Sequence, residues 1–371
     1  MDVPTLTREL VAIPSHEDET AAGDYIERWL REHTTGAVER DRHGNVFARK
    51  GDGDHSLALV GHHDVVPPDD SQVTGDAPPG HRGGDGETAA DGEYVVSEDE
   101  GRLYGRGSAD MKGAVAAAMC AFRDADPACE LVFVSFAGEE QGGEGARPAI
   151  ADGFVPDYAV VGEGSTGYSA PGVTDVAVAH KGRRGSTVTA RGSAAHASEP
   201  EAGANAIYRA ADAVDVIRDL DFPATEVLGH EVQGSVAVTE IDGGSAWNVI
   251  PERCEITVDE RTVPDERAPL ERVGEIPGVE WTVDQDLPPM ACEDAAFAEG
   301  VLAAADEAQK DDPEHVVKPH ATDAGWLAAA GTQCVVCGAA EPGEAHTATE
   351  SVSLAVLDRC YDIYRTVAES V

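Results

Sequence analysis

The stretch LALVGHHDVVPP, from Leu57 to Pro68, places two histidines and an aspartate at the end of an apolar run. The run is typical of a buried strand, and the two prolines predict that the strand stops there. An imidazole beside a carboxylate is what a metal site requires. Because side chains alternate along an extended segment, we expect His62 and Asp64 on one side and His63 on the other. Asp64 can then orient His62 as a metal ligand without binding the metal itself.

Strand and helix patterns alternate on both sides of this stretch. Apolar residues recur at helical spacing over residues 6–32, GAVAAAMCAFRDA is typical of a helix, and ELVFVSFAGEE and YAVVGEG are typical of strands. This order predicts an α/β fold with a mostly parallel sheet and helices on its faces. From about Val176 the strands alternate in polarity, as half-exposed antiparallel strands do. We therefore expect an α/β domain of residues 1–179 and 287–371, with a smaller α+β domain of residues 180–286 inserted into it.

The net charge of the chain limits the classes of partner that it is expected to bind. It has 70 acidic residues against 27 lysines and arginines, a formal net charge of -43. This charge repels nucleic acid and anionic membranes, so we expect neither as a partner. It is typical of a halophilic protein, because concentrated salt screens the repulsion between surface carboxylates. No apolar run approaches the ~18 residues of a membrane span, and the N-terminus lacks a secretory pattern, which predicts a cytoplasmic protein.

The cysteines and residues 68–98 have structural explanations rather than functional ones. The chain has seven cysteines, an odd number that does not suggest a disulfide framework. Cys334 and Cys337 have CxxC spacing, but no second CxxC completes a zinc tetrad, so we expect them in a buried strand. Residues 68–98 are rich in Gly, Pro and Asp and lack periodicity, which predicts a solvated loop.

Acidic and imidazole side chains recur where strands are predicted to end, which is where sites form in open α/β sheets. Two imidazoles with several carboxylates suit zinc, or a related ion such as cobalt or manganese. If one carboxylate bridges, two ions can share five ligands, namely His62, Asp110, Glu140, Glu163 and His346. Glu139 and Glu140 point apart on an extended segment, so one can ligate while the other stays free as a base.

The segments LALVGHHDVV, GRGSADMKGAVAA, AGEEQGGEGA, VVGEG and GEAHTATE, in this order and spacing, resemble the M20 metallopeptidase family. The resemblance covers nearly the whole chain. It implies a catalytic domain that binds two zinc ions and an inserted lid domain that forms a homodimer. It also implies roles for the residues at the strand ends: one ion at His62 and Glu163, the other at Glu140 and His346, a bridge at Asp110, an orienting role for Asp64 and the general base at Glu139.

The inserted domain carries further matches to this family. GSAAHASEPEAGANAI resembles its lid motif, which implies that His196 stabilises the developing oxyanion, reaching across the dimer. Asn248 and Arg261 resemble residues that hold the carboxylate and backbone groups of a substrate, because a guanidinium binds a carboxylate through two hydrogen bonds. Arg261 on a strand can equally be a surface residue.

Three residues bear on the choice of substrate. HKGRRGSTV resembles the Gly-Arg-Arg-Gly-Ser stretch of succinyl-diaminopimelate desuccinylases, which implies that Arg183 and Ser186 contact a substrate carboxylate. HATDAGW occupies the position of the family's Thr-Asp turn, which implies that Thr322 faces the substrate. Two features depart from the desuccinylases: Ala194 and Ala195 replace the usual Gln-Gly pair, and the acidic loop replaces the Trp and Pro-Phe segment before LYGRG.

From these matches we expect an amidohydrolase that takes a small N-acyl amino acid, N-succinyl-LL-2,6-diaminopimelate, and releases succinate and LL-diaminopimelate in lysine biosynthesis. An acetylornithine deacetylase, an aminoacylase, a dipeptidase or a carboxypeptidase remain alternatives, because these enzymes differ in the shape of the pocket around the same metals. A metal-binding pseudoenzyme is an alternative of another class. The presence of all five ligands and of Glu139 argues against it.

Overall fold

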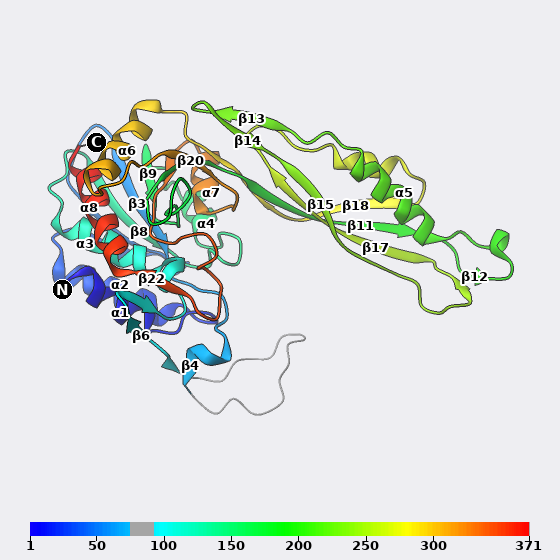
Figure 1. The fold of residues 1–371 in the computed structure, drawn as a ribbon, viewed down its shortest axis with the longest axis horizontal. Coiled ribbons are helices and arrows are strands. Elements are labelled where there is room, and N and C mark those ends of the chain that lie inside the picture. The colour runs from blue at the N-terminus through cyan, green and yellow to red at the C-terminus, as the bar shows by residue number, and fades with distance from the viewer. Residues whose placement is uncertain (75–92, 371) are drawn as a thin grey trace. The chain divides into compact units, whose positions relative to one another are not determined.

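The computed structural model describes residues 1–74 and 93–370 of the 371-residue chain, and they form two compact units (Figure 1). Unit 1 comprises Met1–Ala179, Ala291–Lys318 and Thr322–Val371. Unit 2 comprises His180–Met290 and the short segment Pro319–Ala321. Unit 2 is therefore largely one continuous insertion between two parts of unit 1. The boundaries between the units lie after Ala179 and Met290, whereas the sequence patterns suggest boundaries at residues 179 and 287.

Within the described residues, unit 1 is built on a nine-stranded sheet. The strands follow each other in space as β1 (Ala37–Arg40), β2 (Val46–Lys50), β8 (Glu130–Phe136), β3 (Ser56–His62), β9 (Tyr158–Val161), β21 (Gln333–Val336), β10 (Val176–His180) and β19 (Met290–Ala291), with β20 (His315–Lys318) paired to β10. The central strands β8, β3, β9 and β21 are parallel, whereas β1, β2 and β10 pair antiparallel with their neighbours. The predicted mixed α/β fold is confirmed, with parallel pairing among β8, β3, β9 and β21.

Helices cover the sheet of unit 1. The helices α1 (Val3–Val11), α3 (Gly113–Asp124), α6 (Ala295–Glu307) and α8 (Leu354–Ser370) form one layer, in which α3 contacts β3 and β8. On the other side of the sheet lie α4 (Ala146–Ala151) and α7 (Asp323–Ala329), and α7 packs against β9 and β21 (Figure 1). The helix α3 is buried on all sides because its small alanines permit close approach of α1 and α8.

The helical spacing over residues 6–32 corresponds to two helices rather than one. Asp2 caps the N-terminus of α1, where its carboxylate accepts a hydrogen bond from the Thr5 N–H. After Val11 the chain leaves the helix at a segment that contains Pro14, and α2 begins at Thr20 and ends at His33. A proline disfavours helical backbone in the residue before it, which explains the break.

The predicted acidic loop contains short regular elements. A 3-10 turn at Asp70–Gln72 leads into β4 (Val73–Thr74), which pairs with β5 (Glu93–Tyr94). Further on, β6 (Ser97–Asp99), β7 (Arg102–Tyr104) and β22 (Ser351–Ser353) form a three-stranded sheet. Residues 75–92 of the predicted loop lie outside the described residues.

Unit 2 is a four-stranded antiparallel sheet with a helix packed on it. Its strands lie in the order β15 (Ser235–Gly243), β17 (Arg253–Thr262), β11 (Gly182–Arg191) and β18 (Val279–Leu287), and α5 (Ala206–Arg218) contacts all four. Val188, Ile256 and Val258 of the sheet and Ala210 of α5 are among the fully buried core residues. Two small two-stranded antiparallel sheets add to the unit, one from β12 (Ala195–His196) and β16 (Val249–Ile250), the other a hairpin of β13 (Ala224–Val227) and β14 (His230–Gln233).

The cysteines are buried and free. Cys334 lies in β21 and Cys337 just after it, and neither forms a disulfide. Among the described residues, no helix combines the length and apolar character that a membrane span requires.

Candidate metal centre

The predicted ligands in unit 1 follow the carboxyl ends of the parallel strands. His62 is the last residue of β3 and lies opposite Phe136, the last residue of β8, three residues before Glu139. Val161 at the end of β9 is paired with Val60 of β3, so Glu163 follows at the same level of the sheet. Parallel pairing in register thus gathers residues that are far apart in the sequence at one edge of the sheet.

Asp110 lies between the two histidines. One carboxylate oxygen, Oδ1, is 3.2 Å from His62 Nε2, and the other, Oδ2, is 3.1 Å from His346 Nε2. The same His62 Nε2 is also 3.4 Å from Glu163 Oε1. The same His346 Nε2 is also 3.0 Å from Glu140 Oε1. The five predicted ligands therefore form two groups that share Asp110, one oxygen to each group.

Asp64 holds the chain around these ligands. The His62 Nδ1 is 3.0 Å from the backbone oxygen of Asp64 and 3.4 Å from its carboxylate. The same carboxylate accepts hydrogen bonds from the N–H groups of Glu139, at 3.1 Å, and Glu140, at 3.0 Å. With Nδ1 occupied in this way, His62 presents Nε2 toward Asp110 and Glu163. Asp64 thus also orients the segment that carries the two glutamates.

His63 faces away from the ligands. Its Nδ1 is 2.9 Å from Ser135 Oγ on β8, and the ring is fully buried. Burial lowers the pKa of His63 to about 3, so the ring is neutral. Alternation along the strand end explains why one histidine lies in the centre and its neighbour lies in the core.

In the metal-free site, burial and close contacts between titratable side chains determine which of these side chains carry a proton. Hydrogen bonds to Asp110 and Glu140 raise the pKa of His346 to about 10. Burial lowers the pKa of His62, but hydrogen bonds to Asp110, Asp64 and Glu163 outweigh it and raise this pKa well above its ordinary value. Burial raises the pKa of Glu139 well above its usual range, with Asp323 and Glu163 adding to the effect and His62 opposing it. The histidines therefore carry protons that a metal ion must displace.

Lys318, which the sequence patterns did not single out, is a buried cation next to a predicted ligand. Its Nζ donates to Glu163 Oε2 at 3.2 Å and to the backbone oxygen of Gly164 at 3.0 Å, and the residue is 5 % exposed. Glu163 therefore presents only Oε1 to the metal side. A signal was present in the sequence, because Lys318 is one of five lysines and ends a short strand.

The Thr-Asp turn lies in unit 1 at the start of α7. The Thr322 hydroxyl accepts a hydrogen bond from the Ala324 N–H as an N-cap, and the residue is buried. Its neighbour Asp323 is 4 % exposed, and within the described residues neither carboxylate oxygen has a hydrogen-bond partner. Burial raises the pKa of Asp323 to about 8. Asp323 is a second residue that sequence reasoning missed, since an aspartate at a helix start is normally solvated.

The predicted residues of unit 2 fall into two groups. Arg183 on β11 and Arg261 on β17 are cross-strand partners, and their Nε atoms bind opposite oxygens of Asp259 at 2.8 Å each. The two guanidinium groups share one carboxylate, which leaves a net positive charge. Ser186 lies on the same strand as Arg183, but it is buried and its hydroxyl has no partner within the described residues.

His196 and Asn248 form the second group. His196 is in β12, which pairs with β16 directly after Asn248, and the Asn248 backbone oxygen accepts a hydrogen bond from Ala197 at 2.9 Å. The His196 side chain is exposed, and its Nδ1 is 2.7 Å from Ser198 Oγ. The antiparallel pairing of β12 with β16 therefore brings together two residues that the family resemblance assigned separately.

The donor atoms in unit 1 fit divalent metal ions. Two overlapping sets have their ligand atoms within 4.8 Å of one another, one formed by His62, Glu139 and Glu163 and the other by His62, Asp110 and Glu140. Imidazole nitrogens combined with carboxylate oxygens suit zinc, cobalt or manganese. His62 belongs to both sets, and His346 lies next to the second set through its contacts with Asp110 and Glu140.

The sequence pattern of the peptidase family M20/M25/M40 matches residues 58–370, most of the chain. The chain belongs to this peptidase family. It is accordingly a hydrolase of a metallopeptidase family.

Several solved structures share the fold of this chain. An aminopeptidase PepT from Bacillus cereus is 18% identical with a TM-score of 0.78, over 99% of this chain and 97% of that one. An M20 family metallo-carboxypeptidase from Sulfolobus solfataricus is 13% identical with a TM-score of 0.74, over 99% of both chains. The YXEP protein of Bacillus subtilis, described as a dinuclear metal binding peptidase, is 16% identical with a TM-score of 0.66, over 99% of this chain and 96% of that one.

Proposed function

We propose that this protein is a two-metal amidohydrolase that cleaves an N-acyl group from an amino acid. The observation that carries the proposal is the position of Asp110, whose two carboxylate oxygens each face a different histidine and glutamate pair. His62 and Glu163 would hold one ion, and Glu140 and His346 the other. Zinc is the expected metal, with cobalt or manganese as substitutes.

Glu139 would act as the general base and acid. Two bound ions would polarise the scissile carbonyl and lower the pKa of water in the site. Glu139 lies beside the ligand group, and its backbone is held by Asp64. Its carboxylate can take a proton from the attacking water and later give it to the departing amine. Its raised pKa in the metal-free protein favours holding a proton, which suits the second step.

N-Succinyl-LL-2,6-diaminopimelate is the substrate we propose, with succinate and LL-diaminopimelate as products in lysine biosynthesis. Support comes from Arg183 and Arg261, which share Asp259 and leave a net positive charge for a substrate carboxylate. The Gly-Arg-Arg-Gly-Ser stretch that contains Arg183 and Ser186 resembles the desuccinylases. Asn248 and Thr322 complete the proposed set of substrate contacts.

A peptide substrate is the second candidate. Proteins with similar structures are described as an aminopeptidase, a tripeptidase, a carboxypeptidase and dipeptidases, and they share the fold over nearly the whole chain. Acetylornithine and N-acetyl amino acids are further alternatives. The N-acyl amino acids and dipeptides carry the scissile amide on the α-carbon that bears a carboxylate, whereas in a tripeptide cleaved at its first bond the carboxylate is one residue further away. The same metal chemistry would serve each of these amide bonds.

The test is hydrolysis of a substrate panel by purified protein in molar KCl with zinc or cobalt. The panel contains N-succinyl-diaminopimelate, N-acetylornithine, N-acetyl amino acids, dipeptides and tripeptides. A preference for the succinyl compound is expected, whereas a preference for a peptide would assign the second candidate. Metal content measured on the same samples should show two ions per chain, and fewer than two would contradict the proposed centre.

Glu139→Ala separates an enzyme from a metal-binding pseudoenzyme. We expect this variant to keep both ions and to lose at least ~100-fold in kcat, because general acid–base catalysis typically contributes that much. Glu144→Ala is the matched control, since Glu144 is an exposed glutamate of the same segment. Turnover that is unchanged in Glu139→Ala would contradict the proposed base, and a wild type that binds metal but hydrolyses nothing on the panel would favour a pseudoenzyme.

We also propose that unit 2 forms a homodimer in which His196 donates to the developing oxyanion. The His196 ring is exposed, and its hydrogen bonds to Ser198 are made through Nδ1. Sedimentation in high salt should show a dimer, and His196→Ala should lower kcat without loss of metal. A fully active monomer would contradict a role for His196 across the dimer.

The buried free cysteines support a reducing compartment such as the cytoplasm.

A further inference from the structure

Glu350 is a buried glutamate four residues after His346, and its side chain contacts the segment that carries Asp110. Its Oε1 accepts hydrogen bonds from two consecutive N–H groups, those of Ala109 at 3.0 Å and Asp110 at 3.1 Å. Its Oε2 accepts a hydrogen bond from Arg106 Nη1 at 2.6 Å. The residue is 1 % exposed, so these bonds are shielded from water.

The main chain joins the same two segments. The Gly105 N–H donates to the backbone oxygen of Glu350 at 3.1 Å, and β22 pairs with β7 so that Ser351 lies opposite Tyr104. Side-chain and backbone bonds therefore connect residues 102–110 with residues 346–353. Asp110 and His346 lie on these two segments, although 236 positions separate them in the sequence.

His346 depends on this connection more than the other ligands do. Its side chain is half exposed, and its backbone has a left-handed φ of 62°, so neither core packing nor a regular element holds it. In contrast, His62 ends a buried strand, and Glu163 lies two residues after another and is also bound by Lys318. The path of the His346 loop is set partly by Glu350, whose N–H donates to the Thr347 oxygen at 3.3 Å.

We infer that Glu350 is a positioning residue that keeps Asp110 and His346 at the separation one metal ion requires. Loss of its carboxylate would weaken the ion at Asp110, Glu140 and His346 more than the ion at His62 and Glu163. The inference rests on the proposed two-metal function and adds a residue to it that contacts neither metal nor substrate. Groups that orient metal ligands from behind typically change metal affinity by ~10–100-fold.

The test compares Glu350→Ala and Glu350→Gln with Glu260→Ala in the full-length protein. Glu260 is a matched control in unit 2, because it is also 1 % exposed, binds an arginine, Arg184, at 2.6 Å and accepts the Ala268 N–H at 2.7 Å. Metal-free samples are titrated with Co²⁺ by calorimetry and by visible absorption, which reports the coordination of each ion. Thermal unfolding of the metal-free proteins measures stability separately.

We expect Glu350→Ala to bind one Co²⁺ like the wild type and the other at least tenfold more weakly, with an altered absorption band for the second ion. Glu350→Gln keeps an oxygen for the two N–H groups but sets its amide N–H against Arg106, so an intermediate loss is expected. Glu260→Ala should lose thermal stability yet bind both ions normally.

Four outcomes are decisive. Wild-type affinity for both ions in Glu350→Ala would overturn the inference, as would an equal loss of affinity in Glu260→Ala. If Glu350→Ala does not fold, Glu350→Gln decides alone, and unchanged binding of both ions in it would overturn the inference. A wild type that binds fewer than two ions would instead overturn the proposed function, so the two failures are distinguishable.

Discussion

At the scale of single residues, the contact between Lys318 and Glu163 controls how one predicted ligand is presented. Glu163 Oε2 binds Lys318 Nζ, so the second oxygen alone faces His62. In the absence of metal, the lysine is also the counter-charge of a buried carboxylate. A buried ion pair of this kind is costly to break from one side, because Glu163 would keep only His62, which it shares with Asp110, as a partner for its charge.

Replacement of Lys318 by methionine should therefore destabilise the metal-free protein by about 3–5 kcal/mol. Added zinc should restore more stability to this variant than to the wild type, because the ion can neutralise Glu163. Thermal unfolding with and without zinc measures both effects. Lys310→Met at an exposed position is the control, and equal unfolding temperatures for the two variants would refute the expectation.

The raised pKa of His346, about 10, makes a prediction about pH. This value lies above the ordinary histidine value of 6.5, so the bonds to Asp110 and Glu140 stabilise the metal-free fold fully below pH 6.5. Their contribution is lost as pH rises toward 10. The stability advantage of the wild type over His346→Asn should thus shrink between pH 6.5 and 10, as measured by urea unfolding. An advantage that is constant over this range would contradict the assignment.

Metal affinity should change in the opposite direction. The imidazoles of His62 and His346 must lose their protons before they bind a metal ion. Cobalt binding should therefore tighten as pH rises from 6 to 8 and should release protons. Calorimetry in two buffers of different ionisation enthalpy detects this release, and an affinity independent of pH would argue against histidine ligands.

At the scale of elements, glycines permit the close approach of β9 and β21 where the ligands emerge. A Cβ on Gly338, just after β21, would lie 2.0 Å from the Gly162 oxygen and 2.5 Å from the Glu163 oxygen. Both contacts are to backbone, so the segment that carries Glu163 would have to move. The packing of two strand ends thus constrains the position of a predicted metal ligand.

Gly338→Ala should accordingly lower stability by at least ~1–3 kcal/mol and weaken metal binding as well. Gly300→Ala is the matched control, since a Cβ at this position in α6 meets no atom within 4 Å. That control should be neutral or gain up to ~1 kcal/mol, because alanine favours helix over glycine. Unfolding and cobalt titration of both variants give the comparison, and normal metal binding in Gly338→Ala would show that Glu163 tolerates the shift.

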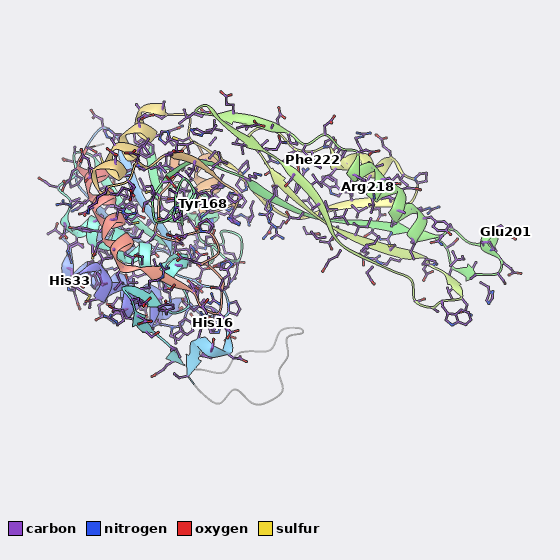
Figure 2. All side chains as sticks on the ribbon, viewed as in Figure 1. His16, His33, Tyr168, Glu201, Arg218 and Phe222 are labelled. Carbon is purple, nitrogen blue, oxygen red and sulfur yellow. The ribbon has the colours of Figure 1, made fainter. Side chains whose placement is uncertain are left out.

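At the scale of the whole molecule, the net charge of -43 determines the response to salt. Surface ion pairs such as Arg218 with Asp215, at 2.5 Å, are highly exposed and stabilise the fold little (Figure 2). Repulsion between the many unpaired carboxylates is therefore the larger electrostatic effect. Screening shortens the range of this repulsion from about 10 Å in 0.1 M salt to about 3 Å in 1 M salt.

We expect the free energy of unfolding to rise steadily between 0.1 and 2 M KCl. Urea unfolding at several KCl concentrations measures this change. Sucrose at matched osmolality is the control for preferential exclusion, since it leaves the charges unscreened. A stability that falls or stays constant with KCl would contradict a halophilic surface.

The local sequence predicts much of this fold, because the spacing of apolar residues along a strand or helix follows from the geometry of that element alone. The end of β3 at His62, the helix at Gly113–Asp124 and the antiparallel strands of unit 2 were all predicted in this way. The antiparallel pairing of β1, β2 and β10 with their neighbours was not predicted from the alternation of strands and helices. Pairing direction depends on how distant elements pack, which local spacing does not encode.

The residue types at the strand ends, together with the family resemblance, predicted which side chains would meet. The structure places Asp110 between His62 and His346, which contact Glu163 and Glu140 in turn. Only the tertiary structure brought Lys318 to Glu163 across 155 positions and Glu350 to Asp110 across 240. It also tied Arg183 and Arg261 to Asp259 through strand register. The reason is physical: a motif records neighbours along the chain, whereas partners of buried charges are chosen by long-range packing that leaves no local pattern.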